Sequence, residues 1–243
     1  MIAAIKKYIH SQQFDPGLLG IWVNPFYFAR KELRREMVRF APRMMHGRLL
    51  DVGCGTKPYQ VLFAAADDYV GLEYDSPENR VAKRADYFYD GNAFPFEDAS
   101  FDGVICNEVL EHVFNPDQFL REIFRVLKPS GDLLLSVPFV WDEHEQPWDY
   151  ARYSSFGLKN LLERNGFVVV EQRKTNANAQ VLFQLVNAYL YKILLTSNAK
   201  VNLAVYATVM APFNVLGILL GKLLPANPDL YLDQVVLAMK QTE

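Results

Sequence analysis

Hydrophobic and polar positions along the chain predict strands and helices that alternate. Strands are expected at residues 49–52, 69–73, within 80–90, and at 101–107, 133–137, 167–172 and 234–240. Several of these are nearly continuous apolar runs, as buried parallel strands require. Apolar residues at helical spacing between them predict helices at residues 27–45, 59–66, 116–127 and after Ser154 or Ser155. The order predicts an α/β fold: a doubly wound, mostly parallel seven-stranded Rossmann-like sheet with helices on both faces.

The turn after the first strand has the residues of a nucleotide-like site. Gly53 and Gly55 let the backbone take a positive φ or approach a ligand closely. Glu73, about twenty residues further on, ends the second strand and can accept hydrogen bonds from a ribose diol. NAD would fit these features too, but Pro58 replaces the third glycine of a G-x-G-x-x-G fingerprint, and Asp51 is unfavourable beside a pyrophosphate. The balance favours S-adenosylmethionine (SAM), which carries two cationic groups and no phosphate.

Further motifs follow in register. They lie at residues 90–96, 100–102, 109–113 and 125–131. Together with residues 49–55 and Glu73, their order and spacing resemble class I SAM-dependent methyltransferases, in particular the small-molecule group that includes the ubiquinone-biosynthesis enzymes. The resemblance covers residues 25 to 175 and a last piece near the C-terminus.

The resemblance and the residue types assign a role to each cofactor-binding candidate. Asp51 is expected at the amino-acid end of SAM, with the turn residues Gly53, Cys54 and Gly55. Glu73 is expected to hold the ribose. The adenine would lie beside Asp90, Gly91 and Asn92, and Asn107 matches the position whose backbone meets the methionine part.

Two histidines are candidates for chemistry. A hydroxyl acceptor needs a general base, because its proton must leave as the new bond forms. His144 lies in an acidic and aromatic loop directly after the fifth strand, and we expect it to be that base, oriented by Asp149. His112 is interpreted as structural or pocket-lining, with a catalytic role as the alternative. His144, Glu143 and Glu145 could be drawn as a metal site, but adjacent residues on one loop rarely converge on one ion, so no metal is expected.

The chain departs from the family pattern between the sixth and seventh strands. More than fifty residues intervene, and the only charges from residue 177 to residue 224 are Lys192, Lys200 and Lys222. Thr208, Pro212, Asn214 and two glycines argue against a transmembrane helix, although the run approaches spanning length. Three interpretations stay open: peripheral contact with a membrane, a homodimer interface through residues 177–224, or a cap over the substrate pocket.

Composition narrows the setting of the protein. The formal net charge of −3 gives no reason to expect a nucleic-acid partner. Cys54 and Cys106 are expected to be reduced, buried thiols, and the N-terminal residues lack a secretion signal, so a cytoplasmic location is expected. The helix at residues 27–45 carries six cations against two acids. Its basic face is either a solvated surface or a contact for phosphate groups or an anionic bilayer.

The expected organisation is an N-terminal segment (residues 1–24), a SAM-binding domain (25–176 and 229–243) and a hydrophobic helical insertion (177–228). The expected function is SAM-dependent methyl transfer to a small or lipid- or glycan-linked acceptor, most readily at oxygen, in the cytoplasm or at the inner face of the membrane. The alternatives are a non-catalytic SAM-fold protein serving a membrane-associated assembly and an NAD-dependent oxidoreductase.

Overall fold

The computed structural model describes residues 11–44 and 46–242 of the chain. These form two compact units, each built from separated pieces of sequence. Among the described residues, the helical unit comprises residues 11–35, 140–142 and 174–233, and the sheet unit comprises residues 36–139, 143–173 and 234–242. The helical spacing noted near the N-terminus falls within residues 1–10, outside the described residues. The domain boundaries expected at residues 24, 176 and 228 are not tested by these packing units and stay a prediction.

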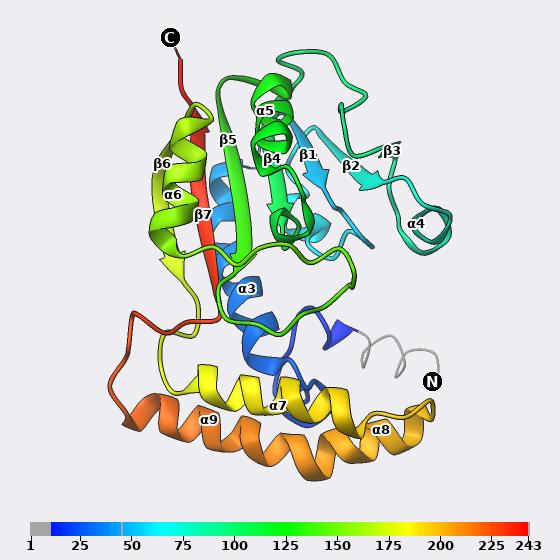
Figure 1. Cartoon of the computed structure of the whole chain (residues 1–243), viewed down its shortest axis with the longest axis vertical. Helices are drawn as coiled ribbons and strands as arrows, with labels where there is room; N and C mark the ends of the chain where they lie inside the picture. The colour runs from blue at the N-terminus through cyan, green and yellow to red at the C-terminus, as the bar shows by residue number, and fades with distance from the viewer. Residues whose placement is uncertain (1–10, 45, 243) are drawn as a thin grey trace. The chain divides into compact units, whose positions relative to one another are not determined.

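A seven-stranded sheet organises the sheet unit (Figure 1). Its strands are β1 (Arg48–Val52), β2 (Asp68–Tyr74), β3 (Tyr87–Tyr89), β4 (Phe101–Asn107), β5 (Leu127–Pro138), β6 (Phe167–Lys174) and β7 (Asp233–Lys240). They are arranged in the order β3-β2-β1-β4-β5-β7-β6. The pairs β1–β2, β1–β4, β2–β3 and β4–β5 are parallel, and β7 runs against its neighbours (Figure 1). The predicted fold class is confirmed.

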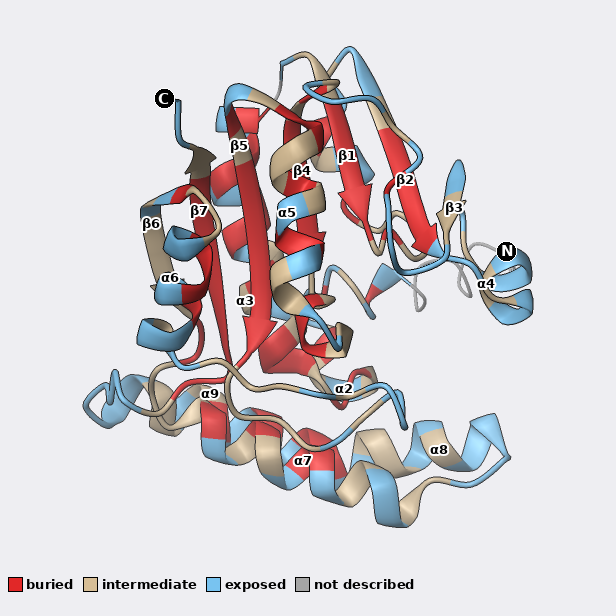
Figure 2. Cartoon of the chain, turned by 45° about the horizontal axis from the view of Figure 1, so that its top comes forward, coloured by how far each residue is buried: buried red, intermediate tan, exposed pale blue. Residues whose placement is uncertain are grey.

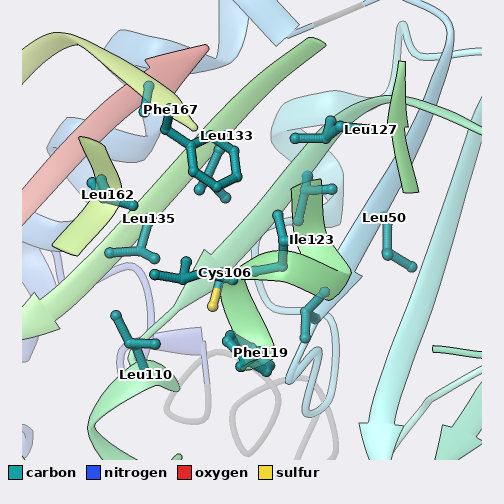
Figure 3. Close-up of a cluster of buried hydrophobic side chains, with 14 of the residues drawn as sticks. Leu50, Cys106, Leu110, Phe119, Ile123, Leu127, Leu133, Leu135, Leu162 and Phe167 are labelled. Carbon is teal, nitrogen blue, oxygen red and sulfur yellow. The ribbon is translucent and has the colours of Figure 1, made fainter. Parts of the chain in front are cut away.

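Helices on both faces bury this sheet. In Figure 1, α5 (Pro116–Val126) and α6 (Ser155–Arg164) lie in front of the strands, and the C-terminal part of α3 (Tyr27–Phe40) lies behind them. Asn115 caps α5 and Ser154 caps α6, each accepting a hydrogen bond from a backbone N–H in the first turn, as their side chains favour. A cluster of buried apolar side chains lies between α5, α6 and the strands (Figure 3), and each large side chain buried there contributes about 1.5–3 kcal/mol.

One predicted helix is wrong. Residues 59–66 form only a single 3-10 turn, η2 (Gln60–Phe63), closed by i→i+3 bonds such as Leu62 N to Tyr59 O at 2.8 Å. Lys57 takes a φ of +56°, so the chain leaves the glycine turn in the left-handed region, and β2 begins before a longer helix could form. A turn this short offers little of the dipole that a full helix would present to a ligand at the glycine turn.

The basic helix is also shorter than expected, since α3 ends at Phe40 and a 3-10 turn, η1 (Ala41–Met44), follows. Its cations are engaged locally. Arg35 pairs with Glu32, and further ion pairs join Arg34 to Asp15, Arg39 to Glu171 and Arg43 to Asp132. These partners favour the interpretation of a solvated face over a phosphate-binding one.

The helical unit contains the hydrophobic segment and the N-terminal pieces. Its elements are α2 (Gly20–Val23), the first part of α3, α7 (Gln180–Leu194), α8 (Ala199–Val205), the π-helical turn η4 (Tyr206–Met210) and α9 (Ala211–Leu223). The remaining short helix, α4 (Pro77–Ala82), belongs to the sheet unit. Buried amides join the elements. Asn187 Nδ2 on α7 donates to Asn214 Oδ1 on α9 at 3.0 Å, and Gln184 Oε1 accepts from Phe28 N at 3.0 Å.

Candidate active site

The candidate residues gather where the parallel strands end. Val52 of β1 pairs with Leu72 of β2 and Cys106 of β4, so the turns that follow these three strands open at one edge of the sheet. The loop after β5 starts at the same edge, because Ser136 pairs with Asn107. This is where ligands bind in open α/β sheets.

The glycine turn has the predicted backbone conformation. Gly53 has φ +69°, and a Cβ there would lie 2.3 Å from Val109, so no side chain fits. Gly55 has φ +52°, and a Cβ there would meet nothing within 4 Å, which leaves open space over the turn. Its N–H donates to Glu73 Oε2 at 2.9 Å. The N–H groups of Gly53 and Cys54 both donate to Leu72 O, so the turn is held closed against β2.

Glu73 has acceptor capacity left for a diol. It is 9% exposed, and its other oxygen accepts from Tyr74 N at 3.2 Å. A carboxylate offers about four acceptor sites, of which these two bonds take half. A ribose can bind the remaining sites without breaking the contact to Gly55.

Asp51 is a buried carboxyl with one close partner. It is 6% exposed, and Tyr69 OH donates to its Oδ2 at 2.7 Å. Burial raises the pKa of Asp51 to about 7, although the bond from Tyr69 acts in the opposite direction. A cationic ligand group would favour ionised Asp51, which is the role expected for it at the ammonium of SAM.

The remaining cofactor candidates flank these acids. Asp90 Oδ1 accepts from Asn92 N at 3.0 Å, and Gly91 has φ +89° beside Tyr74, the last residue of β2. Asn107 ends β4, and its Oδ1 lies 2.8 Å from Ser136 Oγ. Cys54 is a free, buried thiol; burial raises its pKa to about 12, so it contributes shape rather than chemistry.

This donor set fits SAM. Asp51 and Glu73 lie where β1 and β2 end, close enough for the charge of Glu73 to raise the pKa of Asp51. Two neighbouring carboxyl groups suit a ligand with a sulfonium and an ammonium, and they disfavour the pyrophosphate of NAD. The individual assignments to adenine, ribose and methionine stay predictions.

The two candidate histidines meet although they are far apart in sequence. Their rings lie 4.7 Å apart, nearly perpendicular. His112 belongs to a 3-10 turn, η3 (Leu110–His112), which ends there because Val113 already has extended φ and ψ. Its Nδ1 donates to Trp148 O at 2.7 Å. Tyr150 N donates to Glu111 O at 2.8 Å, so the loop after β5 is fastened to η3 from both directions.

Asp149 orients His144 through the backbone more than through the ring. Its Oδ2 accepts from His144 N at 2.9 Å, while the distance from that oxygen to His144 Nδ1 is 3.4 Å, too long for a good hydrogen bond. Arg152 binds both carboxylate oxygens, at 2.6 and 2.7 Å. Burial alone would raise the pKa of Asp149, but Arg152 and the His144 N–H outweigh it and lower the pKa to about 2.

A third group completes the cluster. Glu111 is fully buried, and its Oε1 lies 3.7 Å from His112 Nε2. The ligand atoms of Glu111, His112 and His144 all lie within 4.8 Å of one another, a set that could hold a divalent cation. It differs from the adjacent set His144, Glu143 and Glu145 considered from the sequence, and the expectation of no metal stays a prediction.

Three residues of the site were not singled out from the sequence. Arg152 stands three residues after Asp149 in a loop already rich in charge, and this spacing was an available signal. Tyr69 and Glu111 reach Asp51 and His112 only through the fold. No local pattern marks Tyr69, whereas Glu111 lies in the motif at residues 109–113.

Comparisons with known proteins agree with this geometry. A family described as "Methyltransferase domain" matches residues 26–172. The chain is 30% identical over 182 residues to O-methyltransferase rstn1 of Aspergillus nomiae, covering 63% of this chain and 80% of that one. It is 34% identical over 164 residues to a probable S-adenosylmethionine-dependent methyltransferase of Mycolicibacterium smegmatis, covering 62% of each. The chain thus spans less than two thirds of the latter's length.

A solved structure with the same fold holds the expected cofactor. It is phosphoethanolamine N-methyltransferase 2 of Haemonchus contortus in complex with S-adenosyl-L-methionine, with a TM-score of 0.56, 17% sequence identity, and coverage of 97% of this chain and 57% of that one. At this identity the likeness concerns the fold alone. Together with the sequence matches, it favours methyl transfer over the nicotinamide-dependent alternative.

Proposed function

Since the chain belongs to the methyltransferase-domain family and is a SAM-dependent methyltransferase, we propose that it methylates a hydroxyl oxygen of a small, or lipid- or glycan-linked, acceptor. The observation that carries the proposal is the pair His112 and His144, brought to the edge of the sheet where the cofactor residues lie. The similarity to O-methyltransferase rstn1 supports oxygen as the acceptor atom.

SAM supplies an activated methyl group, which an acceptor displaces in line with the leaving sulfur. The chain's own work is to position the acceptor and to remove its proton. We propose that His144 Nε2 accepts the proton that leaves the hydroxyl of the methyl acceptor. His144 Nδ1 lies 3.4 Å from both Asp149 Oδ2 and the Arg152 guanidinium, and the backbone bond to Asp149 fixes the loop. Asp149 stays ionised at neutral pH, because the bonds from Arg152 and from the His144 N–H outweigh the effect of burial and lower its pKa to about 2.

His112 lines the same space in this proposal. Its Nδ1 is committed to Trp148 O, so its ring is fixed, and its Nε2 faces Glu111. These contacts suit a residue that shapes the pocket and orients the acceptor. They leave His144 as the residue assigned to proton removal.

The test is the substitution His144→Ala, with His46→Ala as the matched control because His46 is exposed and remote in sequence from the loop. Loss of a general base lowers turnover by about 10²–10⁴-fold. We expect this loss in S-adenosylhomocysteine production with phenolic and lipid-hydroxyl acceptors, with SAM affinity unchanged by calorimetry. If His144→Ala raises only the KM for the acceptor, His144 positions the acceptor and is not the base.

The cellular setting is part of the proposal: the cytoplasm, at the inner face of the membrane. Support comes from the acid-free composition of residues 177–224, and from two thiols, Cys54 and Cys106, that are free and buried. A lipid-linked acceptor would be consistent with that setting. Fractionation of cells into soluble and membrane pools tests the location.

A further inference from the structure

The helices α7 and α9 show an inversion of polarity: they expose apolar side chains and bury polar ones, the reverse of a helix on a water-soluble surface. The exposed row of α7 consists of Leu182, Val186, Tyr189 and Ile193, at spacings of four, three and four residues. Such spacing places them on one face. Three of these side chains are more than half exposed: Leu182 at 53%, Tyr189 at 66% and Ile193 at 56%. A soluble helix would carry charged and polar side chains here.

The same inversion occurs on α9. Its exposed row contains Val215, Leu216, Leu219 and Leu223, with Leu219 at 51% and Leu223 at 68%. Among the described residues, one continuous helix, Ala199–Leu223, is long and apolar enough to cross a membrane by length and composition. A core helix of a soluble protein would pass that test with most of its surface buried. Here only 22% of the apolar window is buried.

The hidden faces of both helices are polar or small. Gln184 and Asn187 on α7 and Asn214 on α9 are buried and hydrogen-bonded. Gly217 and Gly221 let the helices approach closely: a Cβ would lie 3.1 Å from Phe183 Cβ at the first and 2.8 Å from Gln180 Cγ at the second. Small residues at the contact, with amides joining the helices, are typical of helix packing in lipid.

Both apolar rows face away from the same segment. Gln184 Nε2 donates to Pro25 O at 2.9 Å, and Asn214 Nδ2 donates to Ile21 O at 2.9 Å. The two helices therefore turn their polar sides toward residues 21–28, and their exposed rows away from it. Figure 2 shows buried residues on the inner sides of α7 and α9 and exposed ones on their outer sides. We call the two exposed rows together the outer surface.

The charged side chains near the outer surface favour a lipid bilayer over a second copy of the chain as its partner. Residues 177–224 contain three lysines and no acid. Lys192 is paired with Asp142 at 2.9 Å, while Lys200 and Lys222 stand near opposite ends of the long helix and are exposed. In a symmetric dimer through this patch, Lys200 and Lys222 would approach lysines of the partner copy, and no acid within residues 177–224 would neutralise them. Lysines that flank an apolar surface can instead reach lipid head groups.

We propose that the outer surface docks onto an anionic lipid bilayer, with the apolar rows of α7 and α9 in the acyl boundary and Lys200 and Lys222 at the head groups. The helices lie in the interface rather than crossing it, because their buried amides hold them against residues 21–28. This inference does not depend on the identity of the methyl acceptor.

The test is flotation of the full chain with vesicles of phosphatidylcholine alone, or of phosphatidylcholine with phosphatidylglycerol. Wild type should float with the anionic vesicles and be released in part by high salt. Lys200→Gln and Lys222→Gln should each weaken vesicle binding about five-fold, equivalent to about 1 kcal/mol. The double variant Leu182→Glu/Leu219→Glu should weaken it at least about 100-fold, because two apolar side chains leave the acyl boundary.

Phe156→Glu is the matched control. Phe156 lies on α6 in the sheet unit and is 84% exposed, so the same apolar-to-acid change there should leave vesicle binding intact. Unchanged SAM affinity in every variant shows that the fold is kept. Equal binding to neutral vesicles, equal flotation of the double variant, or a stable dimer indifferent to vesicles would each overturn the proposal. Methyl transfer to soluble acceptors is measured separately, so failure of one proposal does not imply failure of the other.

Discussion

Replacing Asp51 by Asn should change the pH dependence of both stability and SAM binding. The pKa of Asp51 is raised from its ordinary value of 3.8 to about 7, chiefly by burial. A folded-state pKa above the unfolded value means that the folded protein binds the proton more tightly. The contribution of protonated Asp51 to the free energy of unfolding is fully present below about pH 4 and is lost as the pH rises through about 7. A shift of about three units corresponds to about 4 kcal/mol.

Urea denaturation near pH 4 and near pH 8 measures this effect. Asp51→Asn keeps an acceptor for Tyr69 OH but cannot ionise. As the pH rises from about 4 to about 8, the unfolding free energy of wild type should therefore fall by about 4 kcal/mol more than that of the variant. All other titrating groups are shared by the two proteins and cancel in the difference. Parallel pH profiles for the two proteins would refute the idea that Asp51 is buried in an unfavourable environment.

SAM binding should show the opposite sign. Only ionised Asp51 can pair with the ligand ammonium, so wild-type affinity should rise about tenfold from about pH 6 to about pH 8. The variant should bind with little pH dependence, and more weakly than wild type at the upper end by about 1.5–3 kcal/mol. Isothermal calorimetry at several pH values measures both. A pH-independent wild type would remove Asp51 from the ammonium site.

Three further outcomes follow from single contacts. Glu73→Ala should raise the Kd for SAM by about 10–100-fold in calorimetry, with Asp75→Asn as an unaffected control; unchanged affinity would refute the ribose assignment. Asp149→Asn should lower the unfolding free energy at neutral pH by at most about 2.5 kcal/mol, and the difference from wild type should shrink as the pH falls from about 4 through about 2, because the folded-state pKa of Asp149 is depressed to about 2. Gly217→Ala should cost about 1–3 kcal/mol in denaturant unfolding, since its Cβ would lie 2.6 Å from the Phe28 ring; an equally stable variant would mean that α9 can shift away.

The sequence predicted the sheet well, because burial on both faces leaves a local signature. The run from Phe101 to Asn107 has the bounds of β4, the helix expected at residues 116–127 is α5, and Ser154, one of the two expected starting points, caps α6. These features depend on residues within a few positions of one another. Helix 59–66 was predicted wrongly, because the chain enters this segment through a left-handed backbone conformation at Lys57 that residue types do not reveal, and only a 3-10 turn follows.

The cluster of His112, His144 and Glu111 depended on tertiary structure. The positions of His112 and His144 after two predicted strands made both of them candidates from the sequence. Their contact, however, arises because the loop after β5 folds back onto η3 through Tyr150 N and Trp148 O. The inversion of α7 and α9 was likewise beyond reach. Composition showed an apolar, acid-free segment, whereas only the structure shows that amides such as Asn187 face inward and residues such as Leu182 face outward.

The order of the strands in the sheet also constrains how the chain is made. β7 follows every other strand along the chain, yet it lies between β5 and β6. During synthesis β6 therefore has no neighbour to pair with until β7 (Asp233–Lys240) has emerged. The two strands that flank β7 in the sheet, β5 and β6, are both made well before it. Val235, Val236 and Leu237 then fill the gap with buried side chains. A nascent chain halted before residue 233 would expose two unpaired strand edges, which invites aggregation or chaperone binding until the last strand inserts.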